Sequence, residues 1–128
     1  MNAVTNTDTD TATEADRVYA VAAELFATMA APLRLKIIAA LCVQEKNVGQ
    51  LLADIDTTQP NMSQHLGVLY RAGILARRRE GTQVYYRVAN AKAVSLCRAV
   101  CTQIAIEIDD PGAVGPDERL APALALGL

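Results

Sequence analysis

The chain has 128 residues, of which 52% are hydrophobic and 20% are charged. This is the size of one compact domain with a core of its own. No apolar run approaches the roughly 18 residues that a membrane-spanning helix needs, and residues 1–15 lack the basic and apolar segments of a secretory signal. We therefore expect a single cytoplasmic domain without a membrane partner, in which the Asn61-Met62-Ser63 sequon has no role.

The formal net charge is only −2, but the charges are segregated along the chain. Residues 1–16 carry four acids and no base, and residues 107–128 carry five acids against one arginine. The stretch 59–98 carries seven bases against one acid. A basic middle between acidic ends is the pattern expected of a nucleic-acid-binding domain.

The first 55 residues predict short helices. Thr13-Glu14-Ala15-Asp16 offers an N-cap with a carboxylate three residues on, and apolar residues then recur at helical spacing until Pro32. We expect residues 1–14 to be a flexible acidic arm. A second helix follows from Leu33 and ends near Cys42 or Val43, before a polar turn. Residues 48–54 form a third, short helix.

The next segment predicts a helix-turn-helix. The pair Thr57-Thr58 caps a helix whose Pro60 lies in the first turn, where its missing N–H costs nothing, and Gly73 supplies the stop. This helix and the short one before it are joined by a tight turn. Two helices so arranged are typical of DNA-binding proteins.

After Gly73 the apolar period changes from about 3.6 to 2, which predicts a β-hairpin of residues 74–79 and 82–88 around Glu80-Gly81. Asn90 then caps a long final helix that is apolar almost all round. So small a protein needs a second surface to cover such a helix, and a homodimer partner is the simplest source. Residues 109–128 are rich in Pro, Gly and Ala, and we expect a loose tail.

The fold class is therefore mainly α with a small β-hairpin wing, a winged helix-turn-helix over residues 15–108. The segment 29–38 resembles the junction between the first and second helices of the ArsR/SmtB family of repressors. The segment 57–69, followed by 71–75, resembles the recognition helix of that family, and the segment 78–88 resembles its wing. The resemblance covers about residues 20–105. It implies five helices with the hairpin between the fourth and fifth, a dimer built on the first and last helices, and repression relieved by an inducer.

The chain departs from that family at its familiar metal sites. Where many metal sensors carry Cys-x-Cys, it has Asn47-Val48-Gly49. Where helix-5 zinc sensors carry Asp and His, it has Asn90, Lys92, Gln103 and Ile106. Neither site can form, and we expect no obligatory cofactor. Enzyme motifs are also absent, so we expect no catalysis.

The DNA contacts predicted from the residues follow from the faces of the fourth helix. With Met62, Leu66 and Leu69 packed inward, short polar groups face outward and suit base edges in the major groove: Gln59, Asn61, Ser63, Gln64 and His65. Basic side chains suit phosphates: Arg71, Arg77, Arg78, Arg79 and Arg87. Thr82 and Gln83 lie at the hairpin tip, within reach of an adjacent groove. The alternatives are a solvated helix face or a protein-interaction module with structural cysteines.

Three cysteines remain to be explained, and without an export signal a structural disulfide framework is not expected. Cys97 and Cys101 lie four residues apart on one helix face, close enough for a soft ion to bridge their thiolates. The family fold would bring Cys42 near them as a third sulfur. The alternative is that all three are core residues.

The leading hypothesis is a homodimeric repressor of operator DNA that is released by a small thiol-reactive inducer. Three thiols with no fourth ligand suit arsenite better than zinc. The competing chemistry, implied by the redox-sensing branch of the family, is a disulfide or a sulfur bridge between Cys42 and one cysteine of the final helix.

Overall fold

The computed structural model describes the backbone of residues 2–109 and the side chains of residues 13–109. In chain order it contains α1 (Asn2–Met29), α2 (Pro32–Val43), β1 (Lys46–Asn47), α3 (Val48–Asp54), α4 (Gln59–Arg71), β2 (Leu75–Glu80), β3 (Gln83–Val88) and α5 (Ala91–Asp109). This confirms the winged helix-turn-helix fold. The tail predicted for residues 109–128 lies outside the described residues beyond Asp109.

Helix α1 begins at Asn2, well before the start predicted at Thr13. No Gly or Pro interrupts the chain from Asn2 to Met29, so the helix continues through the capping signal at Thr13 instead of starting there. Helix α2 starts after Ala31 with Pro32 in its first turn and ends at Val43, as predicted.

Strand β1 is the element that the sequence pattern missed. It has only two residues, which pair antiparallel with β3 through Lys46 opposite Tyr86 and Asn47 opposite Tyr85. Asn47 also begins α3 through a capping box with Gln50, in which each side chain hydrogen-bonds the other residue's backbone N–H, at 2.8 and 2.9 Å. The polar turn before α3 therefore joins the sheet instead of forming a free loop.

The predicted signals around α4 and the hairpin are confirmed. Thr58 caps α4 by accepting a hydrogen bond from the Asn61 backbone N–H at 3.3 Å. Gly73 and Gly81 have φ of 79° and 63°, where a side chain would be strained. The sheet order is β1-β3-β2, all antiparallel. At the start of α5, Asn90 accepts from the Lys92 N–H at 2.9 Å.

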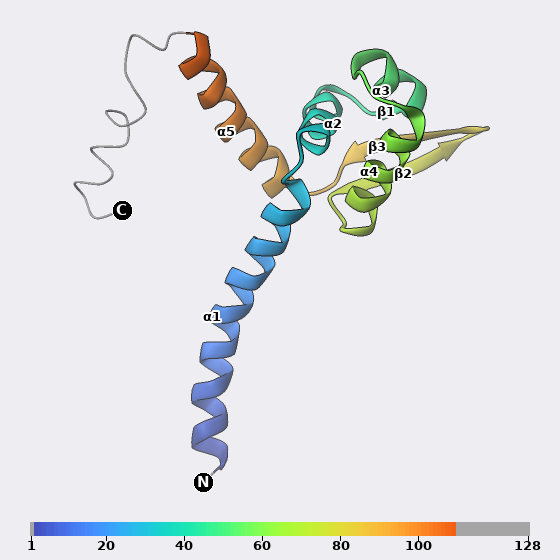
Figure 1. Cartoon of the computed structure of the whole chain (residues 1–128). Coiled ribbons are helices and arrows are strands. Elements are labelled where there is room, and N and C mark those ends of the chain that lie inside the picture. The colour runs from blue at the N-terminus through green and yellow to red at the C-terminus, as the bar shows by residue number, and fades with distance from the viewer. Residues whose placement is uncertain (1, 110–128) are drawn as a thin grey trace.

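The core lies where α2, α3 and α4 pack together and against the sheet, and its fully buried side chains are Ile37, Ile38, Leu51, Met62, Leu66, Leu69 and Ile74. Helix α2 also packs on α5. Figure 1 shows that α1 and α5 extend away from this winged part in different directions. Within the described residues no single helix is long and apolar enough to cross a membrane, and α1 from Thr13 passes that test only together with α2, across a 93° bend.

Candidate nucleic-acid interface and thiol cluster

Helix α4 buries one side and exposes the other. Met62, Leu66 and Leu69 are buried, whereas the side chains of Gln59, Asn61, Ser63, Gln64 and Arg71 are exposed. The side chain of Gln64 makes no hydrogen bond with any described residue. Both its carbonyl and its amino group therefore remain available to a ligand.

The side chain of Asn61 already makes one hydrogen bond within the protein. Its side-chain amino group donates to the Thr57 hydroxyl at 2.9 Å, one turn earlier. The carbonyl oxygen of Asn61 remains free to accept. Of the two amides predicted to contact bases, Gln64 thus keeps the fuller set of donors and acceptors.

His65 differs from the rest of the predicted contact set because it is half-buried. Its Nδ1 accepts a hydrogen bond from the Nε of Arg34 in α2, at 3.0 Å. The role of Arg34 was not apparent from the sequence, since no local pattern connects two residues 31 positions apart.

The three consecutive arginines of β2 have different surroundings. The guanidinium of Arg77 lies 3.9 Å from the ring centre of Tyr70, and its contacts with the hydroxyls of Tyr86 and Tyr70 raise its pKa. Arg78 donates to Glu45 at 2.7 Å and to Glu80 at 2.7 Å. These bonds raise the pKa of Arg78 and lower the pKa of Glu45. Arg79 is exposed and has no ion-pair partner among residues 13–109.

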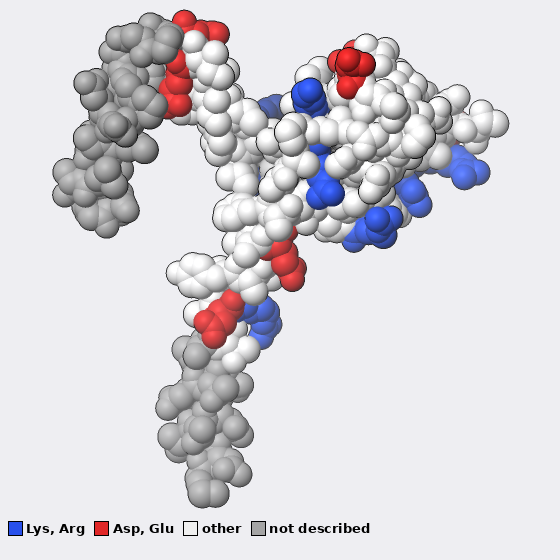
Figure 2. Space-filling view, viewed as in Figure 1, with Lys and Arg blue, Asp and Glu red and all other residues white. Residues whose placement is uncertain are grey.

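The hairpin tip carries the two remaining predicted residues. Thr82 is exposed, and the Gln83 side-chain oxygen accepts from the Asn47 amide at 3.3 Å, which links the tip to β1. Arg87 in β3 is also exposed. In Figure 2 most of the basic side chains gather on the winged part, and most of the acidic ones lie along α1 and at the far end of α5.

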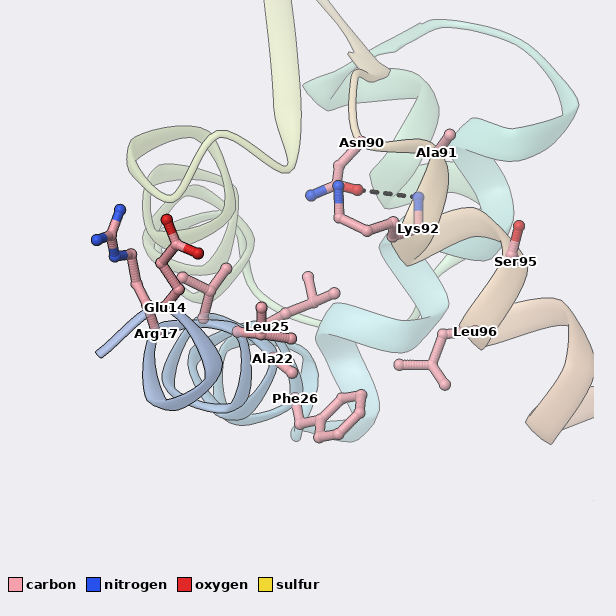
Figure 3. Close-up of a pocket in the computed structure, with 12 residues that line it drawn as sticks. Glu14, Arg17, Ala22, Leu25, Phe26, Asn90, Ala91, Lys92, Ser95 and Leu96 are labelled. Carbon is pink, nitrogen blue, oxygen red and sulfur yellow. Dashed lines mark hydrogen bonds between the residues drawn. The ribbon is translucent and has the colours of Figure 1, made fainter. Parts of the chain in front are cut away.

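Helices α1 and α5 leave an open apolar groove between them, with a volume of about 1210 Å³. Leu25 and Phe26 of α1 face Leu96 of α5 across it, with Asn90 and Lys92 at its edge (Figure 3). Val21 also lines the groove. Farther along α5 the exposed apolar side chains are Val100, Ile104, Ile106 and Ile108. The same two helices thus carry a large unpaired apolar surface.

The structure brings two of the three cysteines together. The Sγ atoms of Cys97 and Cys101 are 3.9 Å apart, and Cys97 Sγ lies 4.0 Å from the carbonyl oxygen of Leu35 in α2. Cys97 is buried, Cys42 is half-buried and Cys101 is exposed. Burial raises the pKa of Cys97 to about 11, with smaller contributions from Cys101 and from the charge of Cys42.

Cys42 contributes least to the raised pKa of Cys97 and does not complete a ligand set. No group of three or more His, Cys, Asp or Glu side chains in the described part of the chain is arranged to hold a metal ion. A site that uses all three thiols therefore needs an arrangement of these side chains other than the one seen here.

Comparison with known proteins assigns the family. The family model for arsR-type bacterial regulatory proteins matches residues 31–77. The HTH-type transcriptional regulator Rv0081 of Mycobacterium tuberculosis (strain ATCC 25618 / H37Rv) is 36% identical over 107 residues, which cover 83% of this chain and 94% of that protein. The chain belongs to the arsR family.

Solved structures of this arsR-family fold agree with the assignment. The crystal structure of Rv0081 matches with a TM-score of 0.63, covering 75% of this chain and 97% of that chain. The transcriptional repressor BigR from Xylella fastidiosa matches at 39% identity and a TM-score of 0.62, covering 73% and 91%. Reduced HlyU from Vibrio cholerae N16961 matches at 30% identity and a TM-score of 0.64, covering 68% and 92%.

Proposed function

We propose that this arsR-family protein is a homodimeric, DNA-binding transcriptional repressor whose affinity for its operator falls when its cysteine thiols are occupied or oxidised. The observation that carries the proposal is the exposed polar face of α4 beside a basic wing, on a winged helix whose relatives include a transcriptional repressor. Helix α4 is then the recognition helix, and Gln64 and Asn61 contact base edges in the major groove.

The arginines supply the part of the affinity that does not depend on DNA sequence. Arg71 at the end of α4 and Arg79 in the wing are exposed, so each can approach a phosphate without first breaking an ion pair within residues 13–109. Each phosphate that they neutralise releases counterions, and duplex binding should weaken steeply as salt rises. A protein-interaction module on the same fold would not show this salt dependence on DNA.

The homodimer rests on the apolar surface of α1 and α5. Phe26 and Ile104 are about half exposed in the single chain, and a second copy would cover both. A two-fold dimer presents two recognition helices to half-sites about one helical turn, roughly 34 Å, apart.

The inducer site is proposed at Cys97 and Cys101. Their Sγ atoms are 3.9 Å apart, close enough for one soft ion to bond both thiolates. Cys42 supplies the third thiolate once α2 approaches α5. Arsenite fits three soft ligands, whereas zinc is left one ligand short.

The mechanism follows from where the third thiol lies. Cys42 is the second-last residue of α2, and α2 packs on both α5 and α4. Joining Cys42 to the α5 thiols would pull the end of α2 toward α5 and shift α4, which α2 supports. The two recognition helices of a dimer would then change their separation, and operator affinity would fall.

A redox switch is the second candidate, favoured by the structural relative HlyU, which is described specifically in its reduced form. In that chemistry an oxidant removes two electrons and two protons as Cys42 and an α5 cysteine form a disulfide. Alternatively a persulfide transfers its outer sulfur to one of these thiols, and the other thiol then displaces it as hydrogen sulfide. A disulfide between Cys97 and Cys101 themselves is less favourable, because Cβ atoms four residues apart on a helix lie about 5–6 Å apart, farther than the roughly 3.5–4.5 Å that a disulfide spans.

The experiment measures fluorescence anisotropy of the purified protein on the promoter duplex beside its own gene and on a random duplex. We expect tighter binding to the promoter and a steep loss with salt. Gln64→Ala should reduce the preference for the promoter by about 1–3 kcal/mol. Equal affinity for both duplexes at every salt concentration would refute specific recognition of an operator, and binding to neither duplex would refute the DNA-binding proposal.

Cysteine variants separate the two inducer chemistries. If arsenite binds three thiolates, Cys42→Ser, Cys97→Ser and Cys101→Ser should each abolish most of the release from the promoter. A two-thiol redox switch should tolerate one of the three substitutions and respond to persulfide or oxidant. Release of the triple variant by arsenite or persulfide would place the sensor elsewhere.

A further inference from the structure

Arg34 connects three helices. It lies in the first turn of α2, and its Nε donates to His65 Nδ1 of α4 at 3.0 Å. Its Nη1 donates to the backbone carbonyl of Thr28 near the end of α1 at 2.9 Å. A cation that hydrogen-bonds one of the last carbonyls of a helix also interacts favourably with the helix dipole. The guanidinium is therefore held at both ends.

The bond to His65 determines which imidazole nitrogen carries the proton. A guanidinium can only donate, so the Nδ1 that faces Arg34 must be unprotonated. In a neutral imidazole the proton is then on Nε2. His65 Nε2 has no hydrogen-bond partner among the described residues. Every buried side-chain nitrogen or oxygen of those residues has a partner, so Nε2 is not buried. The Nε2–H therefore faces solvent as a free donor.

The position of His65 on α4 indicates what that donor meets. His65 follows Asn61 by one turn, on the edge of α4 next to α2, while Gln64 lies near the middle of the exposed face. When a helix lies in the major groove, its middle faces the bases and its edges approach the two phosphate backbones. An N–H at the edge suits a phosphate oxygen.

We propose that Arg34 is a positioning residue for DNA binding: it fixes His65 as the Nε2–H tautomer and holds that N–H toward the DNA backbone, while tying α4 to the end of α1. The proposal rests on the proposed DNA-binding function. It changes the role of His65 from a base contact to a phosphate contact, and it gives α2 a direct link to the bound DNA.

The first test needs no DNA. His65 is the only histidine in the chain, so ¹⁵N NMR of the imidazole reports this residue alone. In the neutral ring we expect an unprotonated Nδ1 and a protonated Nε2. Arg34→Met keeps an unbranched stem but removes the donor, and we expect it to produce a mixture of tautomers. An Nδ1–H tautomer in the wild type, or an unchanged spectrum in Arg34→Met, would overturn the proposal.

The second test uses two replacements that each imitate one half of the ring. His65→Asn keeps an acceptor near the Nδ1 position but no donor near Nε2, and His65→Gln does the reverse. We expect His65→Asn to weaken binding to promoter and random duplexes about equally, by about tenfold. His65→Gln should retain more of the affinity. A loss of promoter preference in His65→Asn, with random-duplex binding unchanged, would instead assign His65 to a base and contradict the phosphate contact.

A double-variant cycle tests whether Arg34 acts through His65. We expect Arg34→Met to weaken duplex binding several-fold in the wild type and to have little further effect in the His65→Asn background. An equal loss in both backgrounds would mean that Arg34 acts independently of His65. Arg79→Gln is the reference, because it should weaken binding whatever the state of His65. If neither Arg79→Gln nor Gln64→Ala affects DNA binding, the proposed function fails, while the NMR result on Arg34 still stands or falls separately.

Discussion

The winged part of the molecule, from α2 to β3, and the two outer helices α1 and α5 differ in how far their large apolar side chains are buried. In the winged part Ile37, Leu51 and Leu66 are almost inaccessible to solvent. On the outer helices Phe26 remains 54% exposed and Ile104 48%. The winged part thus has a buried core and a polar, basic face, whereas the outer helices present the exposed apolar surface on which the dimer is proposed. The comparison separates the residues that maintain the fold from those proposed to form the dimer.

The largest expected effect is in the core of the winged part. Leu66→Ala removes a side chain that is 1% exposed, and we expect the free energy of unfolding to fall by about 2–5 kcal/mol. The matched control is Val43→Ala at the end of α2, where the side chain is 80% exposed and the change should stay within about 0.5 kcal/mol. Denaturant unfolding measures both. Equal effects would mean that the two positions do not differ in burial.

On the outer helices we test an added charge, which should disrupt the proposed dimer, instead of a cavity in the core. Phe26→Glu puts a carboxylate on the apolar face of α1, and burying it unpaired in a dimer interface is costly. We expect a monomeric protein at micromolar concentration and operator binding weaker by about 100-fold, or about 2.7 kcal/mol. Light scattering and anisotropy measure the two quantities.

Val43→Glu is the control for that substitution, because it adds the same charge at an exposed apolar position outside α1 and α5. It should leave the dimer and its DNA affinity nearly unchanged. A dimeric Phe26→Glu protein with normal affinity would show that this part of α1 does not contribute to assembly.

The cysteine pair lies at the border between the two regions and gives a pH dependence. The pKa of Cys97 rises from 9.0 to about 11 through burial, so the folded chain keeps a proton that the unfolded chain loses. The contribution of this thiol to the free energy of unfolding is fully present below about pH 9. It is lost as the pH rises toward 11, which lowers the free energy of unfolding by on the order of 2 kcal/mol. Unfolding of wild type and Cys97→Ala across this range should show a steeper decline in the wild type. Parallel declines would argue that the thiol is not buried.

The smallest expected effect distinguishes two neighbouring arginines of the wing. Arg79→Gln should weaken binding to any duplex several-fold and flatten the salt slope by about one unit, as for one lost phosphate contact. Arg78→Gln should do less, because Arg78 already pairs with Glu45 and Glu80. Salt titrations of both variants provide the measurement. A larger slope change for Arg78 would mean that DNA displaces those carboxylates.

Much of the fold was predictable because its signals are local. Thr58 at the start of α4, Gly73 at its end and Asn90 before α5 each act within a few residues, and the structure confirms all three. Strand β1 was missed because two residues have no periodicity, and its pairing with β3 depends on a contact nearly 40 residues away.

The residues of the candidate site could be predicted from the sequence, but the contacts between their side chains could not. Periodicity gave the exposed face of α4 and the adjacent Cys97 and Cys101. It gave no indication that Arg78 is paired with Glu45, that Arg34 binds His65, or that Cys42 stops short of a three-ligand set. Each of these depends on side chains from different elements, whose distances only the folded chain defines.

Sedimentation of the full chain with and without its promoter duplex tests the central claim most directly. We predict a species of twice the 13.7 kDa of one chain at micromolar concentration. We further predict two chains on each promoter duplex, and loss of that complex on adding the thiol-reactive inducer. A stable monomer that binds no duplex, or a complex that the inducer leaves intact in the wild type, would contradict the proposed repressor.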